Sequence, residues 1–147
     1  MEWDTYFMEM SKLVASKSKD RSRKVGCVIV GPQREVRSTG FNGFCRGVDD
    51  NVEERHERPA KYYWSEHAER NAIYNASRNG IQLKGCTLYS TVFPCSDCAR
   101  GIIQSGITKV VTTPYSGQTQ MPDESFRVAE EMLRETGVAI EWIDDEV

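Results

Sequence analysis

Short β-branched and apolar runs alternate with amphipathic stretches along this chain, and that alternation constrains the fold more than any other feature. Strands are predicted over residues 25–30, 36–41, 86–92, 107–113 and 138–143, and helices over 3–16, 65–79, 95–104 and 123–135. The resulting order α-β-β-α-β-α-β-α-β implies an α/β fold in which helices cover both faces of one sheet.

Residues 42–64 interrupt the alternation, because they show no clean periodicity and are rich in Gly, Asp, Glu and Arg. A structureless stretch of this length inside a compact domain is usually functional. The helix that follows is predicted to begin with Ser65 as its N-cap and to end at Gly80. Residues 114–122 are predicted to form a loop.

The length fits one domain. With 147 residues and no break in composition, residues 1–147 are predicted to form a single domain with its own core. No apolar run approaches the roughly 20 residues of a membrane-spanning helix. The N-terminal sequence MEWDTYFMEM is acidic and amphipathic, unlike a secretory signal. We therefore expect a cytoplasmic protein with no membrane partner.

The cysteine content favours metal binding or catalysis over disulfide bonds. Five cysteines are an odd number, and without an export signal a disulfide framework is not favoured, so metal binding or catalysis is the better interpretation. The formal net charge of -3 argues against a broad nucleic-acid-binding surface, although the basic run over residues 17–24 leaves a local basic site open.

Two short motifs carry the chemistry. The first, His67-Ala68-Glu69, opens one predicted helix, and the second, Pro94-Cys95-Ser96-Asp97-Cys98, opens the next. One imidazole and two thiolates are ligands that suit zinc, and the positive end of a helix stabilises thiolates. Three protein ligands leave the fourth tetrahedral position open, which is the arrangement of a catalytic zinc.

Glu69 follows the histidine by two residues, where it can take a proton from an activated water and return it to the substrate. The combination of H-x-E with P-C-x-x-C is the signature of zinc nucleobase deaminases. A C-x-x-C pair alone is also typical of structural zinc sites and of thioredoxin-like dithiols. A non-catalytic, zinc-stabilised interaction module also remains open, and such a module would not need Glu69.

At these motifs the chain resembles the cytidine deaminase-like superfamily, and within it the deoxycytidylate (dCMP) deaminases. The resemblance covers residues 25–137 and includes Gly40-Phe41-Asn42-Gly43-Phe44, His67-Ala68-Glu69-Arg70-Asn71-Ala72-Ile73 and Phe93-Pro94-Cys95-Ser96-Asp97-Cys98-Ala99. It implies a three-layer α/β/α sandwich around a five-stranded mixed sheet and a homo-oligomer. It also implies one catalytic Zn²⁺ per chain and hydrolysis of dCMP to dUMP and ammonia.

The same resemblance implies roles for individual residues. The zinc ligands would be His67, Cys95 and Cys98, and Glu69 would move protons. Substrate contacts would come from the Asn42 side chain, which would meet the sugar, and from the backbone of Ala68 and Phe93, which would meet the base edge. Three aromatic residues are candidates to stack on the base: Phe44, Trp64 and Tyr115.

Phosphate recognition needs cations, for which arginine has the best matched geometry. The candidates around the predicted site are Arg23, Lys24, Arg46 and Lys61. Regulated dCMP deaminases bind dCTP or dTTP with the loop after G-x-N-G, so the resemblance implies four candidate effector-binding residues: Arg46, Asp49, Asp50 and Arg55.

The chain departs from the family pattern at a few positions. Cys45 stands where many relatives have proline, and residues 113–118 differ from the corresponding stretch of the animal-type enzymes. Some relatives hold a second, structural zinc, but His56 has no neighbouring cysteine pair, so a second site is not predicted.

Other substrates remain open. The triphosphate dCTP and a 5-methyl- or 5-hydroxymethyl-dCMP would undergo the same chemistry. A tRNA adenosine deaminase or a polynucleotide cytidine deaminase would share the zinc motif. Short tRNA enzymes place their asparagine close ahead of the zinc histidine, whereas 24 residues separate Asn42 from His67 here. A polymer substrate also needs several Lys or Arg contacts, which the acidic net charge disfavours.

Overall fold

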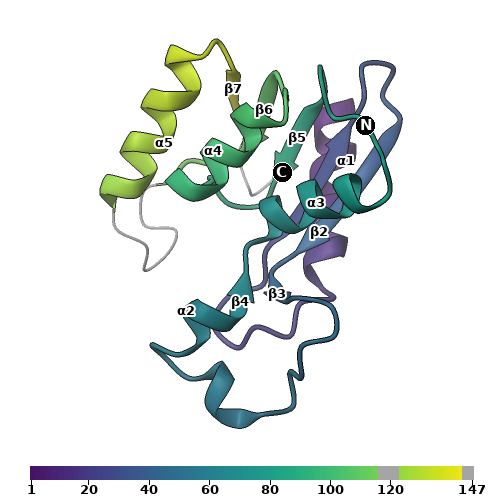
Figure 1. Ribbon diagram of the computed structural model, residues 1–147. Coiled ribbons are helices and arrows are strands. Elements are labelled where there is room, and N and C mark those ends of the chain that lie inside the picture. The colour runs from purple at the N-terminus through teal and green to yellow at the C-terminus, as the bar shows by residue number, and fades with distance from the viewer. Residues whose placement is uncertain (116–122, 144–147) are drawn as a thin grey trace.

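The computed structural model describes residues 1–115 and 123–143 (Figure 1). In chain order its elements are α1 (Trp3–Ala15), β1 (Gly26–Val30), β2 (Val36–Phe41), β3 (Gly43–Phe44), the 3-10 helix η1 (Glu53–His56), α2 (Lys61–Trp64), β4 (Ser65–Glu66), α3 (Ala68–Arg78), β5 (Thr87–Ser90), α4 (Ser96–Gln104), β6 (Lys109–Thr112), α5 (Asp123–Glu135) and β7 (Ala139–Trp142). Each predicted helix and strand is present. Most of the predicted loop over 114–122 lies outside the described residues.

The main sheet has five strands in the order β2-β1-β5-β6-β7. Strand β1 is antiparallel to both β2 and β5, whereas β5, β6 and β7 are parallel. The predicted five-stranded mixed sheet is therefore confirmed. The parallel half places α4 directly after the carboxyl end of β5, so the residues that open α4 lie at the edge of the sheet where α/β proteins bind ligands.

Alternation along β1 divides the core between two faces. Cys27 and Ile29 pack in the cluster that contains the apolar residues of α3, α4 and α5, whereas Val28 and Val30 pack with Phe7 of α1. In Figure 1, α3 and α4 lie in front of the sheet and α1 lies behind it. The predicted three layers are thus confirmed, with α3, α4 and α5 together on one side.

Residues 42–64, which showed no periodicity, contain β3, η1 and α2, and β3 pairs with β4 through Phe44 and Ser65. These elements form a lobe at the lower end of the molecule in Figure 1. The predicted N-cap Ser65 is wrong, because its pairing with Phe44 keeps it extended. The helix therefore begins at Ala68, and His67 is its N-cap.

Helix α3 lies unusually close to β2. An added Cβ at Gly40 would stand 2.3 Å from the Ala72 nitrogen and 2.6 Å from the Ala68 carbonyl oxygen, so only glycine fits there. Two side-chain amides of α3 donate to β2 carbonyls, with Asn71 2.8 Å from the oxygen of Phe41 and Asn75 2.7 Å from that of Thr39. Within the described structure, no helix is long and apolar enough to cross a membrane.

Replacing Gly40 with alanine is expected to destabilise the fold, because the new methyl would overlap backbone atoms that cannot rotate away. We expect Gly40→Ala to lower the free energy of unfolding by about 1–3 kcal/mol, the usual cost of overpacking. Urea denaturation of the zinc-loaded protein measures this change. Gly43→Ala is the matched control, since the nearest atom to its added Cβ is 3.9 Å away. Equal losses in the two variants would contradict this account.

Candidate metal centre and active site

Two helix N-termini bring the motif residues together. His67 and Cys95 are the N-caps of α3 and α4, and both have extended backbones, while Cys98 lies in the first turn of α4. Because α3 and α4 pack on the same face of the sheet, the three side chains converge. Within residues 1–115 and 123–143, His67, Cys95 and Cys98 form the cluster able to hold a metal, with ligand atoms all within 4.8 Å of one another.

The donor atoms of this cluster fit zinc. The Sγ atoms of Cys95 and Cys98 each lie 3.4 Å from the Nδ1 atom of His67. Both cysteines are buried, and His67 is half-buried. Two thiolates and one imidazole nitrogen form a donor set that leaves a tetrahedral ion one open position. The structure therefore brings together the three ligands that the sequence predicted.

The two thiols are electrostatically different. A hydrogen bond from the Cys98 thiol and the neighbouring His67 lower the pKa of Cys95 to about 4, against the opposing effect of burial. The hydrogen bond with Cys95 and burial raise the pKa of Cys98 well above its usual value. The pair therefore favours one thiolate and one thiol, and a cation bound by both sulfurs displaces the remaining proton.

Glu69 is the second residue of α3 and is only 2% exposed. Burial raises the pKa of this carboxyl to about 7, with His67 opposing the shift and Cys95 adding to it. A carboxyl with a pKa near neutrality can accept a proton and return it in the same turnover. The structure thus places the buried carboxyl of Glu69 beside the metal cluster, and its role in proton transfer stays a prediction.

The residues expected at the base edge are also buried. Ala68 is fully covered, and Phe93 is 1% exposed. The ring of Phe93 lies 5.0 Å from that of Tyr115 and 5.1 Å from that of Trp142. Tyr115 also stacks on Phe126 at 5.5 Å. These contacts place Tyr115 in an aromatic cluster, where packing accounts for its position, and its predicted stacking on a base remains a prediction.

Asn42, the predicted sugar contact, connects the end of β2 to the segment before β1. Its Oδ1 accepts the Val25 backbone N–H at 2.8 Å, and its Nδ2 donates to the Arg23 carbonyl at 2.9 Å. Its own carbonyl accepts from the Ser18 hydroxyl at 2.8 Å. An amide oxygen has a second lone pair and an amide nitrogen a second hydrogen, so both ends keep capacity for a further partner.

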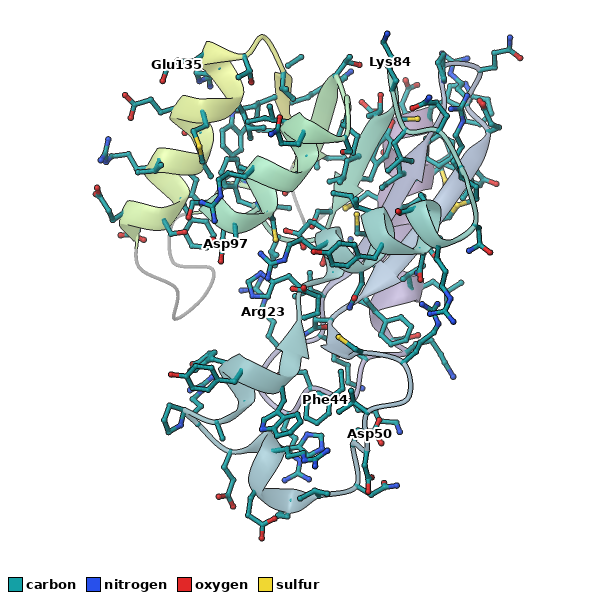
Figure 2. All side chains as sticks on the ribbon, in the orientation of Figure 1. Arg23, Phe44, Asp50, Lys84, Asp97 and Glu135 are labelled. Atoms are coloured by element: carbon teal, nitrogen blue, oxygen red, sulfur yellow. The ribbon has the colours of Figure 1, made fainter. Side chains whose placement is uncertain are left out.

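A pocket of about 320 Å³ lies beside this segment, between the basic run and the lobe. Its polar and charged lining includes Lys17, Lys19, Asp20, Arg21, Asn42, Arg46, Asp50, His56, Lys61 and Ser65. Neither the three candidate metal ligands nor Glu69 lines it. In Figure 2, Phe44 and Asp50 mark this region, well below Asp97 of α4.

The structure divides the predicted phosphate and effector residues. Arg46, Asp50 and Lys61 line the pocket. Asp49 and Arg55 do not, and the guanidinium of Arg55 lies 3.9 Å from the Trp64 ring centre. Arg23 and Lys24 also lie outside the lining, and Lys24 is exposed.

The sequence showed the basic run over residues 17–24, but no local signal indicated that Lys17, Lys19 and Arg21 line a pocket.

Several of the pocket cations already have acidic partners. Lys19 lies 3.0 Å from Asp50, and Lys61 lies 3.3 Å from Asp20. Arg21 forms a two-pronged pair with Glu53 of η1. The lobe is therefore held to the basic run by ion pairs around the pocket.

An aromatic residue of the lobe, Phe44, stacks on His56 with 4.8 Å between ring centres.

Comparisons with known proteins agree with this site. The family model for the cytidine and deoxycytidylate deaminase zinc-binding region matches residues 1–113. The chain is 41% identical to an uncharacterized deaminase in the luxG 3' region of Aliivibrio fischeri, over 97% of this chain and 94% of that one. It is 39% identical to human deoxycytidylate deaminase over 76% of this chain and 64% of that one.

A solved structure gives the same result at the level of the fold. The dCMP deaminase of cyanophage S-TIM5, in complex with dCMP and dUMP, superposes with a TM-score of 0.77, covers 95% of each chain and is 25% identical. The matched family region spans both motifs, His67-Ala68-Glu69 and Pro94-Cys95-Ser96-Asp97-Cys98, which confirms the predicted zinc cofactor and the predicted resemblance. The chain belongs to the cytidine and deoxycytidylate deaminase family.

Proposed function

We propose that this protein is a zinc-dependent hydrolase that deaminates dCMP to dUMP and ammonia, with His67, Cys95 and Cys98 as ligands. The observation that carries the proposal is the buried carboxyl of Glu69 beside a histidine–dicysteine cluster at two adjoining helix N-termini. The relatives named deoxycytidylate deaminase support the monophosphate as substrate over dCTP or a 5-modified dCMP.

The proposed chemistry uses Glu69 twice. When bound, zinc supplies the Lewis acidity that makes a water molecule nucleophilic at neutral pH. Glu69 accepts a proton as the water oxygen bonds to C4 of the base, and delivers it to N3. The second proton of the same water, now on the C4 hydroxyl, passes through the same carboxyl to the 4-amino group. The C4–N bond then breaks, ammonia leaves and the C4 carbonyl of dUMP forms. The pKa of about 7 of the Glu69 carboxyl suits both proton transfers.

The buried base edge provides selectivity in this proposal. Backbone groups of Ala68 and Phe93 lie in fully packed segments, so they cannot move to suit a different base. A site that hydrogen-bonds the amino and carbonyl groups of cytosine is left with unpaired polar groups by a base that lacks them. Asn42 is proposed to meet the deoxyribose with its remaining hydrogen-bonding capacity.

We also propose that the pocket beside the basic run binds a second nucleotide, dCTP or dTTP, as an effector. Its cationic lining suits several phosphates, and an effector is favoured over the substrate because neither Glu69 nor the candidate metal ligands are among the lining residues. Arg46 and Asp50 remain the effector residues in this proposal, with Lys17, Lys19 and Arg21 added. Asn42 lines this pocket and also anchors the segment before β1, which gives the two sites a shared element.

The proposed setting is a homo-oligomer in the cytoplasm. All five cysteines are free thiols, which suits a reducing compartment. Large aromatic side chains on α2 and α3 support an association surface, since Tyr62, Tyr63 and Tyr74 are 58%, 88% and 54% exposed.

Glu69→Gln is expected to abolish deamination while leaving the fold and the zinc content unchanged. Glutamine keeps the shape of the side chain but cannot carry a proton, and proton transfer of this kind contributes typically 10²–10⁴-fold to the rate. The loss of dCMP turnover is measured by ultraviolet absorbance, and the zinc content by metal analysis of the same samples. A variant that retained activity would contradict the mechanism, and so would a wild-type protein that is active without zinc.

Arg46→Ala is expected to weaken dCTP binding by roughly 10–100-fold, the size of effect that one charge-assisted hydrogen bond produces. Titration calorimetry with dCTP measures the change, and Arg134→Ala, which removes an exposed arginine of α5, is the control. An unchanged dCTP affinity together with a raised KM for dCMP, but not for deoxycytidine, would instead assign Arg46 to the substrate phosphate. Equal losses on dCMP and deoxycytidine would contradict any phosphate role.

A further inference from the structure

Arg70 connects the two helices that carry the metal cluster. Its Nη1 atom donates to the Sγ atom of Cys98 at 3.7 Å, and its Nε atom donates to Oε1 of Glu66 at 2.7 Å. The same Glu66 oxygen accepts the backbone N–H of His67 at 2.9 Å. One guanidinium therefore reaches from the residue that precedes one candidate ligand to the thiol of another.

Carboxylates offset part of the charge of Arg70. Its side chain and that of Glu66 are 19% and 20% exposed and form an ion pair, and Asp97 lies 3.7 Å from Nη1 on the solvent side. Asp97 in turn pairs with Arg100. Arg70 therefore acts on Cys98 in two ways, through one directed N–H···S hydrogen bond and through the part of its positive charge that these carboxylates leave uncompensated.

The two sulfurs have different surroundings. Cys95 Sγ lies at the N-terminus of α4, 3.4 Å from the Nδ1 atom of His67, and makes no capping hydrogen bond to the helix backbone. Cys98 Sγ accepts from a side chain of the neighbouring helix. A hydrogen bond to a thiolate withdraws electron density that would otherwise be donated to the metal, and such outer partners also fix the orientation of the ligand.

We propose that Arg70 is a positioning residue of the metal centre, which holds the Cys98 thiolate through an N–H···S bond and braces the His67 backbone through Glu66. This inference rests on the proposed zinc site. It assigns a role to the arginine of H-A-E-R-N, which is the residue just before the strand-contacting Asn71.

The test compares full-length protein with its Arg70→Met, Arg70→Lys and Arg100→Met variants. Methionine keeps length without a donor, and lysine keeps charge but cannot reach Glu66 and Cys98 with one planar group. The Arg100 variant is the matched control, because it removes another arginine that pairs with Asp97, and the Arg100 side chain is exposed on α4. Zinc affinity is measured by competition with a chromophoric chelator, and sulfur-to-metal charge transfer by the absorption spectrum of the cobalt(II)-loaded protein.

We expect Arg70→Met to weaken zinc binding by about 10–100-fold, which is typical for loss of an outer hydrogen bond to a ligand. The charge-transfer band should move to lower energy, because the sulfur loses a donor. Arg70→Lys should lie between Arg70→Met and wild type, and Arg100→Met should match wild type in both measurements.

The inference would be overturned if Arg70→Met left the charge-transfer band in place and kept a zinc affinity within about threefold of wild type, because the expected loss of affinity is about 10–100-fold. Thermal unfolding of each metal-free variant separates a folding defect from a site defect, and if Arg70→Met does not fold, Arg70→Lys decides by the same two measurements. Failure of the wild-type protein to bind one zinc per chain would instead contradict the proposed function.

Discussion

The meeting of two helix N-termini on one face of the sheet is the constraint on which the site depends. Helix α3 begins at Ala68 because β4 holds the preceding residues extended, and α4 begins at Ser96 at the carboxyl end of the parallel strand β5. Their first turns carry the histidine, the two cysteines and the buried carboxylic acid. Closely packed helices hold these groups within a few ångströms, and neither helix could shift without opening the cluster.

The local part of this arrangement could be predicted from the sequence. Each motif occupies one helical turn, so spacing alone places Cys95 near Cys98 and Glu69 near His67. The strands and longer helices follow from their periodicity, and the bounds of α5 match the prediction. The N-cap prediction at Ser65 was wrong because serine suits a helix start, and the pairing of Ser65 with Phe44, 21 residues earlier, depends on a segment that shows no pattern.

The long-range contacts could not be predicted. The pocket combines residues 17 and 19–21 with residues 41–48, 50, 56, 61 and 65, and no local pattern indicates that these segments meet. Arg55 illustrates the difficulty, because the family resemblance indicates an effector contact for it, and its position over the Trp64 ring could not be read from the sequence. The buried metal cluster could therefore be predicted from two short motifs, whereas the charged pocket forms only when distant segments of the chain meet in the fold.

The asparagines of α3 have a consequence for the outer strand of the sheet. Strand β2 is an edge strand, and edges with unpaired carbonyls invite strands from other molecules to extend the sheet. Asn71 and Asn75 occupy the carbonyls of Phe41 and Thr39 with side-chain donors. The helix that follows the metal-binding histidine thus also protects this edge of the sheet against the backbone pairing that leads to aggregation.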